Sequence, residues 1–96
     1  MIIELKKFGV TLTSRQLGKE AYAAFTPTLA QIKNNELIEI VFDGINTFSP
    51  SWGDEFLTPL QKKYGKRLFL HPSDNLSVTT TIKLLEDIGQ FKYQIK

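Results

Sequence analysis

The chain has 96 residues, 42% of them hydrophobic and 23% charged, with no cysteine and a formal charge of +2. This length allows one domain over residues 1–96 and excludes a second, and the composition excludes intrinsic disorder. The lack of cysteine excludes disulfides and thiolate chemistry, and the small net charge does not direct the whole molecule to nucleic acid or anionic lipid.

The first predicted element is an edge strand that ends near Gly9. Ile3 and Leu5 alternate with charged residues, which is the period of a strand with one face in water. The same run is too short for a signal peptide, and lysines follow too early for a membrane span. We therefore expect a cytoplasmic protein with no membrane partner.

A helix is predicted to begin at Ser14 or Arg15. Thr13 and Gln16 have the spacing of a capping box. An apolar stripe follows at helical intervals, formed by Leu17, Ala21, Ala24 and Phe25. Pro27 predicts a break or kink, with a short second helix after it.

Two apolar runs predict buried central strands. Residues Leu37–Phe42 and Leu68–Leu70 are apolar almost without alternation, as in strands that are covered on both faces. The last segment, from Phe91, alternates apolar residues with lysines and a glutamine. This pattern is typical of an edge strand that lysines protect.

Two further helices are indicated by their end signals. Ser49 and Pro50 suit the N-cap and first position of a helix that ends near Tyr64, and Pro59 predicts a kink or an early end in it. The last helix is predicted from a stripe closed by Gly89. That stripe consists of Val78, Ile82, Leu85 and Ile88.

The order β, α, β, α, β, α, β predicts an α/β domain with a four-stranded, mainly parallel sheet and three to four helices. The apolar central strands favour helices on both faces of the sheet. A homodimer that covers one exposed face is the alternative.

Two connections are expected to meet at the carboxyl edge of this sheet, Asp43–Ser51 and His71–Ser77. The first places Ser49 and Ser51 at a helix N-terminus. Two acids, Asp54 and Glu55, follow in the next turn. A helix N-terminus favours anions through its dipole and its free amides.

The segment from Leu12 to Gly65 resembles the STAS-like family of small bacterial domains, relatives of the anti-sigma factor antagonists. The matching residues are Ser14, Arg15 and Gly18, then Asp43, Gly44 and Ile45, and then the run from Ser49 to Leu57. The resemblance implies a STAS-like fold and a non-enzymatic, regulatory role in partner switching. It implies that a kinase or ATPase of the histidine-kinase-like fold phosphorylates a serine.

Aligning Gly44 and Leu57 with the family places Ser51 at the phosphoacceptor, with Ser49 as the second candidate. In the family, aspartate, serine and glycine usually surround this serine, whereas Pro50 and Trp52 flank Ser51 here. The alternative interpretation is that Ser49 is an N-cap and Ser51 a polar residue of the first turn.

The candidate surface for a protein partner is formed by Arg15, Trp52, Gly53, Asp54 and Glu55. The helix dipole disfavours Arg15 in a first turn, so we expect a compensating anion: Asp54, Glu55 or a phosphate. Trp52 is either an exposed anchor or, by its register with Phe56, a core residue. Gly53 is expected to permit close helix packing.

One basic patch is visible, formed by Lys62, Lys63, Lys66 and Arg67 around Tyr64. It predicts either a weak nucleic-acid site or solvated charges that complement a helix dipole, and we favour the second interpretation. His71 could act as a general base with Ser73 and Asp74 nearby, but adjacency in sequence does not make a Ser-His-Asp arrangement, and we favour no catalytic role. One histidine without cysteine is a poor metal site, and no nucleotide-binding motif is present. We therefore expect no enzyme activity, no metal and no cofactor. A structural or assembly module of the same fold is the alternative function.

Overall fold

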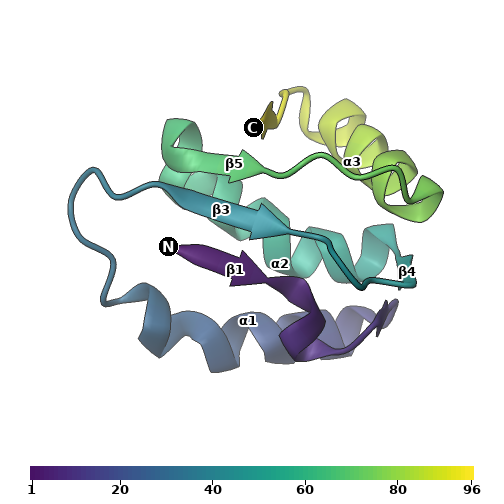
Figure 1. The fold of residues 1–96 in the computed structure, drawn as a ribbon, viewed down its shortest axis with the longest axis horizontal. Helices are drawn as coiled ribbons and strands as arrows, with labels where there is room; N and C mark the ends of the chain where they lie inside the picture. Colours follow the sequence, from purple (N-terminus) through teal and green to yellow (C-terminus); the bar gives the residue numbers. More distant parts are fainter.

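The computed structural model describes residues 1–96 and contains a parallel four-stranded sheet with three α-helices (Figure 1). In chain order the elements are β1 (Ile2–Glu4), the 3-10 helix η1 (Leu5–Phe8), β2 (Thr11–Leu12), α1 (Arg15–Leu29), β3 (Ile38–Val41), β4 (Thr47–Phe48), α2 (Pro50–Tyr64), the 3-10 helix η2 (Gly65–Arg67), β5 (Leu68–Leu70), α3 (Leu76–Gly89) and β6 (Gln94–Ile95). The predicted α/β class and parallel sheet are confirmed.

The strands of the main sheet follow one another in the order β1-β3-β5-β6. Ile3 lies beside Ile40, and Ile40 beside Leu70, so the apolar layer continues across the first three strands. The two predicted central strands, β3 and β5, are central, and the two predicted edge strands are at the edges. Two of the elements are shorter than expected, since β1 gives way to η1 after Glu4 and β6 has only two residues.

The helices lie on one side of the sheet, which corrects the expectation that they cover both faces. Because the strand order follows the chain, successive right-handed crossovers move in the same direction and place every helix on the same side. Burial agrees, since Ile38 and Ile40 are fully buried whereas Ile2 is 64% exposed on the other side. Val41 on that side is buried, and this explains why the apolar run of β3 is nearly continuous.

The first helix differs from its prediction in its cap and in its end. Ser14, not Thr13, is the N-cap, and its hydroxyl accepts a hydrogen bond from the Leu17 amide. The helix runs through Pro27 to Leu29 without a break, so no second helix forms. Pro27 has no N–H, so the helix lacks one hydrogen bond there, and it ends two residues later.

The buried face of this helix matches the predicted stripe only in part: Phe25 is buried and Ala21 packs against the core. Leu17 and Ala24 are exposed, and the residues that are buried are Gly18, Phe25 and Leu29. The predicted stripe therefore omitted Gly18, because a glycine has no apolar side chain that a hydrophobic pattern could detect.

The other two helices match their predicted bounds closely. The N-cap of α2 is Ser49, and the helix continues past Pro59 to Tyr64, so the expected early end is absent. In α3 the predicted stripe is buried except for Ile88, which is 71% exposed. The left-handed residue that ends α3 is Gln90, with φ of 56°, and Gly89 lies against the Phe91 ring.

A small second sheet was not predicted. Thr11 and Leu12 of β2 pair in parallel with Thr47 and Phe48 of β4. These strands have two residues each, too few for a hydrophobic period to show. They hold the entries of α1 and α2 side by side, which positions the site described next. None of the helices combines the length and the apolar character needed to cross a membrane.

Candidate functional site

All three α-helices begin at the carboxyl edge of the sheet, the edge toward which the strand arrows point in Figure 1. Their N-caps are Ser14, Ser49 and Asn75. Each helix N-terminus carries a partial positive charge from its aligned peptide dipoles. This edge is therefore the part of the molecule where a negative group is best tolerated.

Side chains at the start of α3 hold the connection that leads into α2. Asn75 Nδ2 donates to two carbonyl oxygens of this connection, at 2.9 and 3.1 Å. Ser77 Oγ accepts from the Phe48 amide at 3.0 Å, and Thr81 Oγ1 donates to the Phe48 carbonyl at 2.8 Å. The predicted meeting of the two connections is confirmed, but these positioning residues were not recognised. The signal was a polar residue just before an amphipathic helix, the position of an N-cap.

Close packing fixes α2 between its two neighbours. A Cβ on Gly18 would lie 2.8 Å from the Trp52 carbonyl oxygen, and one on Gly53 would lie 3.2 Å from the Thr81 methyl. Trp52 is 2% exposed, and its ring stacks on Phe56 at 5.0 Å. Trp52 and Gly53 are thus packing residues, and neither offers a side chain to a partner in this structure.

With positions 52 and 53 buried, the outer face of α2 is a stripe at helical spacing. We call it the α2 stripe; it consists of Ser51, Asp54, Glu55 and Thr58, all of them partly exposed. Residues three and four apart on a helix are neighbours, so a group added to Ser51 would lie within one turn of both carboxylates.

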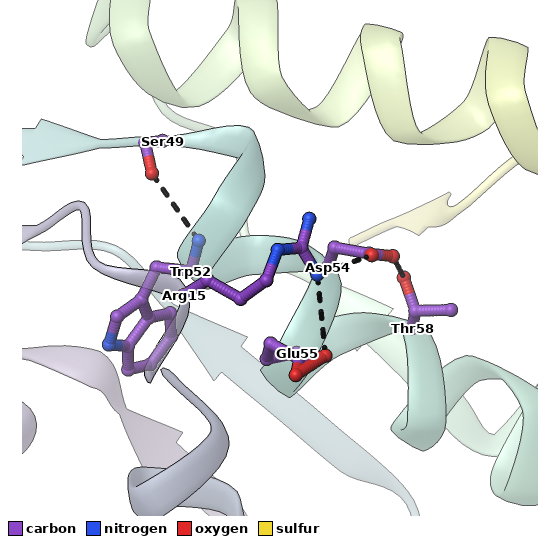
Figure 2. A network of polar contacts seen from close by, with 6 residues as sticks. All are labelled: Arg15, Ser49, Trp52, Asp54, Glu55 and Thr58. Carbon is purple, nitrogen blue, oxygen red and sulfur yellow. Dashed lines mark hydrogen bonds and ion pairs between the residues drawn. The ribbon is translucent and has the colours of Figure 1, made fainter. Parts of the chain in front are cut away.

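Arg15 joins the start of α1 to this stripe (Figure 2). Its Nη1 lies 3.0 Å from Asp54 Oδ2 and 3.5 Å from Glu55 Oε2. The compensating anions expected for Arg15 are therefore the two carboxylates. Partial burial raises the pKa of Asp54, but hydrogen bonds from Thr58, at 2.8 Å, and from Arg15 outweigh it and hold that pKa below its usual value.

The two candidate serines differ in how their hydroxyl groups are used. Ser49 Oγ accepts from the Trp52 amide at 3.3 Å and donates to the Thr13 carbonyl at 2.8 Å. The Ser51 hydroxyl makes no hydrogen bond in the structure. Pro50 has no N–H and the Trp52 amide is engaged, so this N-terminus offers fewer free amides than the sequence suggested.

The basic patch lies at the C-terminal end of α2, a helix length away from Ser51. Lys62 and Lys63 stand in the last turn of α2, where cations complement the helix dipole. Lys63 and Arg67 lie 5.6 and 5.2 Å from the centre of the Tyr64 ring. The chain's own cations thus cover this ring, which favours the helix-dipole interpretation over base stacking.

His71 lies away from the site and pairs with residues of other strands. Its Nε2 is 2.8 Å from Glu39 Oε1, and Lys96 Nζ is 2.9 Å from the same oxygen. Ser73 is engaged elsewhere, since its hydroxyl accepts from the Asn75 amide. The structure brings no three metal-ligating side chains together.

Comparison with protein-family models, with curated proteins and with solved structures gave no match.

Proposed function

We propose that this protein is a non-enzymatic regulatory domain that binds a protein partner through the start of α2, as the resemblance to STAS-like anti-sigma factor antagonists implies. Ser51 is the proposed phosphoacceptor, for a kinase or ATPase of the histidine-kinase-like fold. The observation that carries the proposal is the contrast between the serines: Ser49 is held at both ends of its hydroxyl, and Ser51 is partly exposed and unbonded.

A phosphate on Ser51 would change the charge of the α2 stripe at its N-terminal end. It adds about −1.5 to −2 charges at pH 7, one turn from the carboxylates of Asp54 and Glu55. The N-terminal dipole of α2 favours this charge, whereas the carboxylates oppose it. Arg15 already bridges both carboxylates, so the phosphate would compete with them for its guanidinium. The folded domain tolerates such a change, and a partner docked on the stripe loses its fit.

An apolar hollow beside Ser49 supports docking next to the α2 stripe. It has a volume of about 400 Å³ between the starts of α2 and α3, and Phe48, Pro50 and Leu76 contribute to its lining. Leu76 is 78% exposed, the most exposed of the large hydrophobic side chains. Exposed apolar side chains beside polar groups are typical of interaction surfaces.

The first test is the phosphorylation state of the protein from its own cells, or after incubation with ATP and a candidate ATPase. Intact mass and peptide mapping should find one phosphate on Ser51. A chain that stays unmodified under both conditions contradicts the switch.

The second test compares variants in quantitative co-purification. Ser51→Ala should retain the partner and Ser51→Asp should lose it, because only the second adds charge to the stripe. Asn34→Asp adds the same charge in the turn before β3, at the other edge of the sheet, and should bind like the wild type. Equal binding by both Ser51 variants rejects the switch.

An unmodified assembly module is the second candidate function, and the bare face of the sheet favours it. No helix covers that face, where Ile2 is 64% exposed. Under this hypothesis neither Ser51 variant changes the association, and substitutions on the bare face do.

A further inference from the structure

A second cleft separates α2 from α3 on the outer side of the molecule, farther along α2 than Ser51. Its volume is about 520 Å³, within the range of roughly 300–1,000 Å³ that ligand sites have. Its walls are polar on α2 and mainly apolar on the other side. The lining residues that matter are Asp54, Thr58, Gln61 and Lys62 from α2, and Leu85, Ile88 and Phe91 opposite.

One buried polar atom in the wall of this cleft has no hydrogen-bond partner: Gln61 Oε1. A buried polar atom without a partner costs about 1–3 kcal/mol. An unpartnered acceptor in the wall of a cleft indicates that a hydrogen-bond donor belongs there.

The groups that face this cleft from α2 are mostly acceptors. Thr58 donates its hydrogen to Asp54, so its oxygen has only lone pairs to offer. The Asp54 carboxylate accepts one bond at each oxygen and has further lone pairs free. The Gln61 carbonyl oxygen is buried in the same wall without a partner. The charged side chains that line the cleft are one acid, Asp54, and one base, Lys62.

We propose that this cleft binds the guanidinium group of an arginine side chain from a protein partner. A guanidinium has five N–H donors in one plane and can reach several acceptors at once, whereas an ammonium is a single point charge. Its aliphatic stem would lie along Leu85 and Ile88, and the Phe91 ring favours a cation. Asp54 belongs both to this cleft and to the α2 stripe, so the cleft continues the proposed docking surface. That the arginine comes from a protein partner rests on the proposed function, whereas the binding of a guanidinium to this cleft does not.

A substitution of Lys62 distinguishes a cationic ligand from an anionic one, because Lys62 lines the same cleft and repels a cation. Lys62→Gln should tighten the binding of a guanidinium and weaken the binding of an anion. Gln61→Met keeps the length of the side chain and removes the unpartnered carbonyl. It should weaken guanidinium binding by about tenfold, the value of one charge-assisted hydrogen bond.

The experiment is a titration of the purified protein at low salt with N-acetyl-arginine methylamide, followed by the methyl NMR signals of Leu85 and Ile88. These signals should shift and saturate, and the uncharged citrulline analogue should bind at least about tenfold more weakly. Thermal unfolding of each variant shows that it is folded.

Several results would overturn the proposal. Absence of saturable shifts, with ordered water detected in the cleft, leaves water as the only occupant. Equal binding of the citrulline analogue, or weaker arginine binding by Lys62→Gln, excludes a cation site. Free arginine that binds tenfold tighter than the blocked compound makes this a site for the amino acid. The titration needs neither kinase nor partner, so its failure is separate from that of phosphorylation at Ser51.

Discussion

Gly18 is the residue at which the structure departs furthest from a hydrophobic pattern. It is buried against the Trp52 backbone, and a Cβ there would lie 2.8 Å from a carbonyl oxygen. At an ordinary helix position alanine is more stable than glycine by about 0.5–1 kcal/mol. Here we expect the reverse: Gly18→Ala should lower the free energy of unfolding by about 1–3 kcal/mol, because backbone atoms cannot move aside as a flexible side chain can.

Ala24, exposed on the same helix, provides the matched control. Ala24→Gly should be destabilising by the ordinary propensity difference, about 0.5–1 kcal/mol. Urea unfolding of both variants measures the comparison. A Gly18→Ala variant that is more stable than the wild type would show that α1 and α2 do not pack as closely as described.

Tyr93 carries a phenol that the folded chain does not satisfy. Because Tyr93 Oη is buried without a hydrogen bond, Tyr93→Phe should be neutral or stabilising by about 1 kcal/mol. The pKa of Tyr93 is raised by burial, so the folded state holds its proton more firmly than the unfolded state. Stability should therefore decline as the pH rises above the ordinary tyrosine pKa of 10.0, and this decline should be smaller in Tyr93→Phe. Thermal unfolding between pH 8 and 11 measures it, and a strongly destabilised variant at neutral pH would contradict it.

At the scale of single residues, the sequence predicts the caps and charges of the site better than its packing. Ser49 as N-cap and the need of Arg15 for an anion follow from helix electrostatics, which is local. The burial of Trp52 followed from its register with Phe56. The engagement of the Ser49 hydroxyl at both ends could not be predicted, because one of its partners is the Thr13 carbonyl, 36 residues away in the chain.

Among the elements, α3 has the cap on which most of the site depends. Asn75 accepts from the Ser77 and Val78 amides, and it also donates to two carbonyl oxygens of the connection into α2. Asn75→Ala should cost about 2–3 kcal/mol, since it removes the cap and leaves those carbonyls without partners. Ser14→Ala, at a cap that accepts a single hydrogen bond, should cost about 1 kcal/mol.

Thermal unfolding compares the stability of the two cap variants. Hydrogen exchange at the Phe48 amide reports separately on the connection into α2. That amide is bonded to Ser77 Oγ, whose own hydroxyl donates to Asn75 Oδ1. Exchange should accelerate in Asn75→Ala and not in Ser14→Ala. Equal costs for both caps would show that the start of α2 is held by other contacts.

The helices and strands could be predicted where the hydrophobic period and the residues that mark the ends of an element indicate the same bounds. Both conditions hold for α2, whose predicted bounds are correct, and for the order of the four main strands. Neither Pro27 nor Pro59 ends its helix, so of the predicted break or kink at each proline the break is wrong. The two-residue strands β2 and β4 have no period to detect.

For the whole molecule, acid should reveal how far the bare face contributes to stability. Glu39 joins His71 and Lys96 across that face, and their hydrogen bonds hold the pKa of Glu39 below the ordinary value of 4.5. A lowered pKa means that the unfolded chain binds the proton first. This stabilisation is therefore complete above about pH 4.5 and is lost as the pH falls through the pKa of the folded state.

The stability difference between the wild type and Glu39→Gln should thus shrink on acidification from pH 6 to pH 3. Glu20→Gln, on the exposed side of α1, serves as the control and should show little difference at any pH. Urea unfolding at each pH measures both. A difference that stays constant with pH would show that Glu39 acts through packing alone.

The sequential order of the strands has a consequence for how the chain acquires its fold. Each main strand pairs with the one made just before it, and α2 packs on α1, as α3 packs on α2. Each pairing closes over a whole crossover helix, which makes folding slower than for hairpins, but the order of the strands means that none has to insert between two others. During synthesis from the N-terminus, β1, α1 and β3 can assemble before β5 is made, and each later βα pair then adds to a template that already exists.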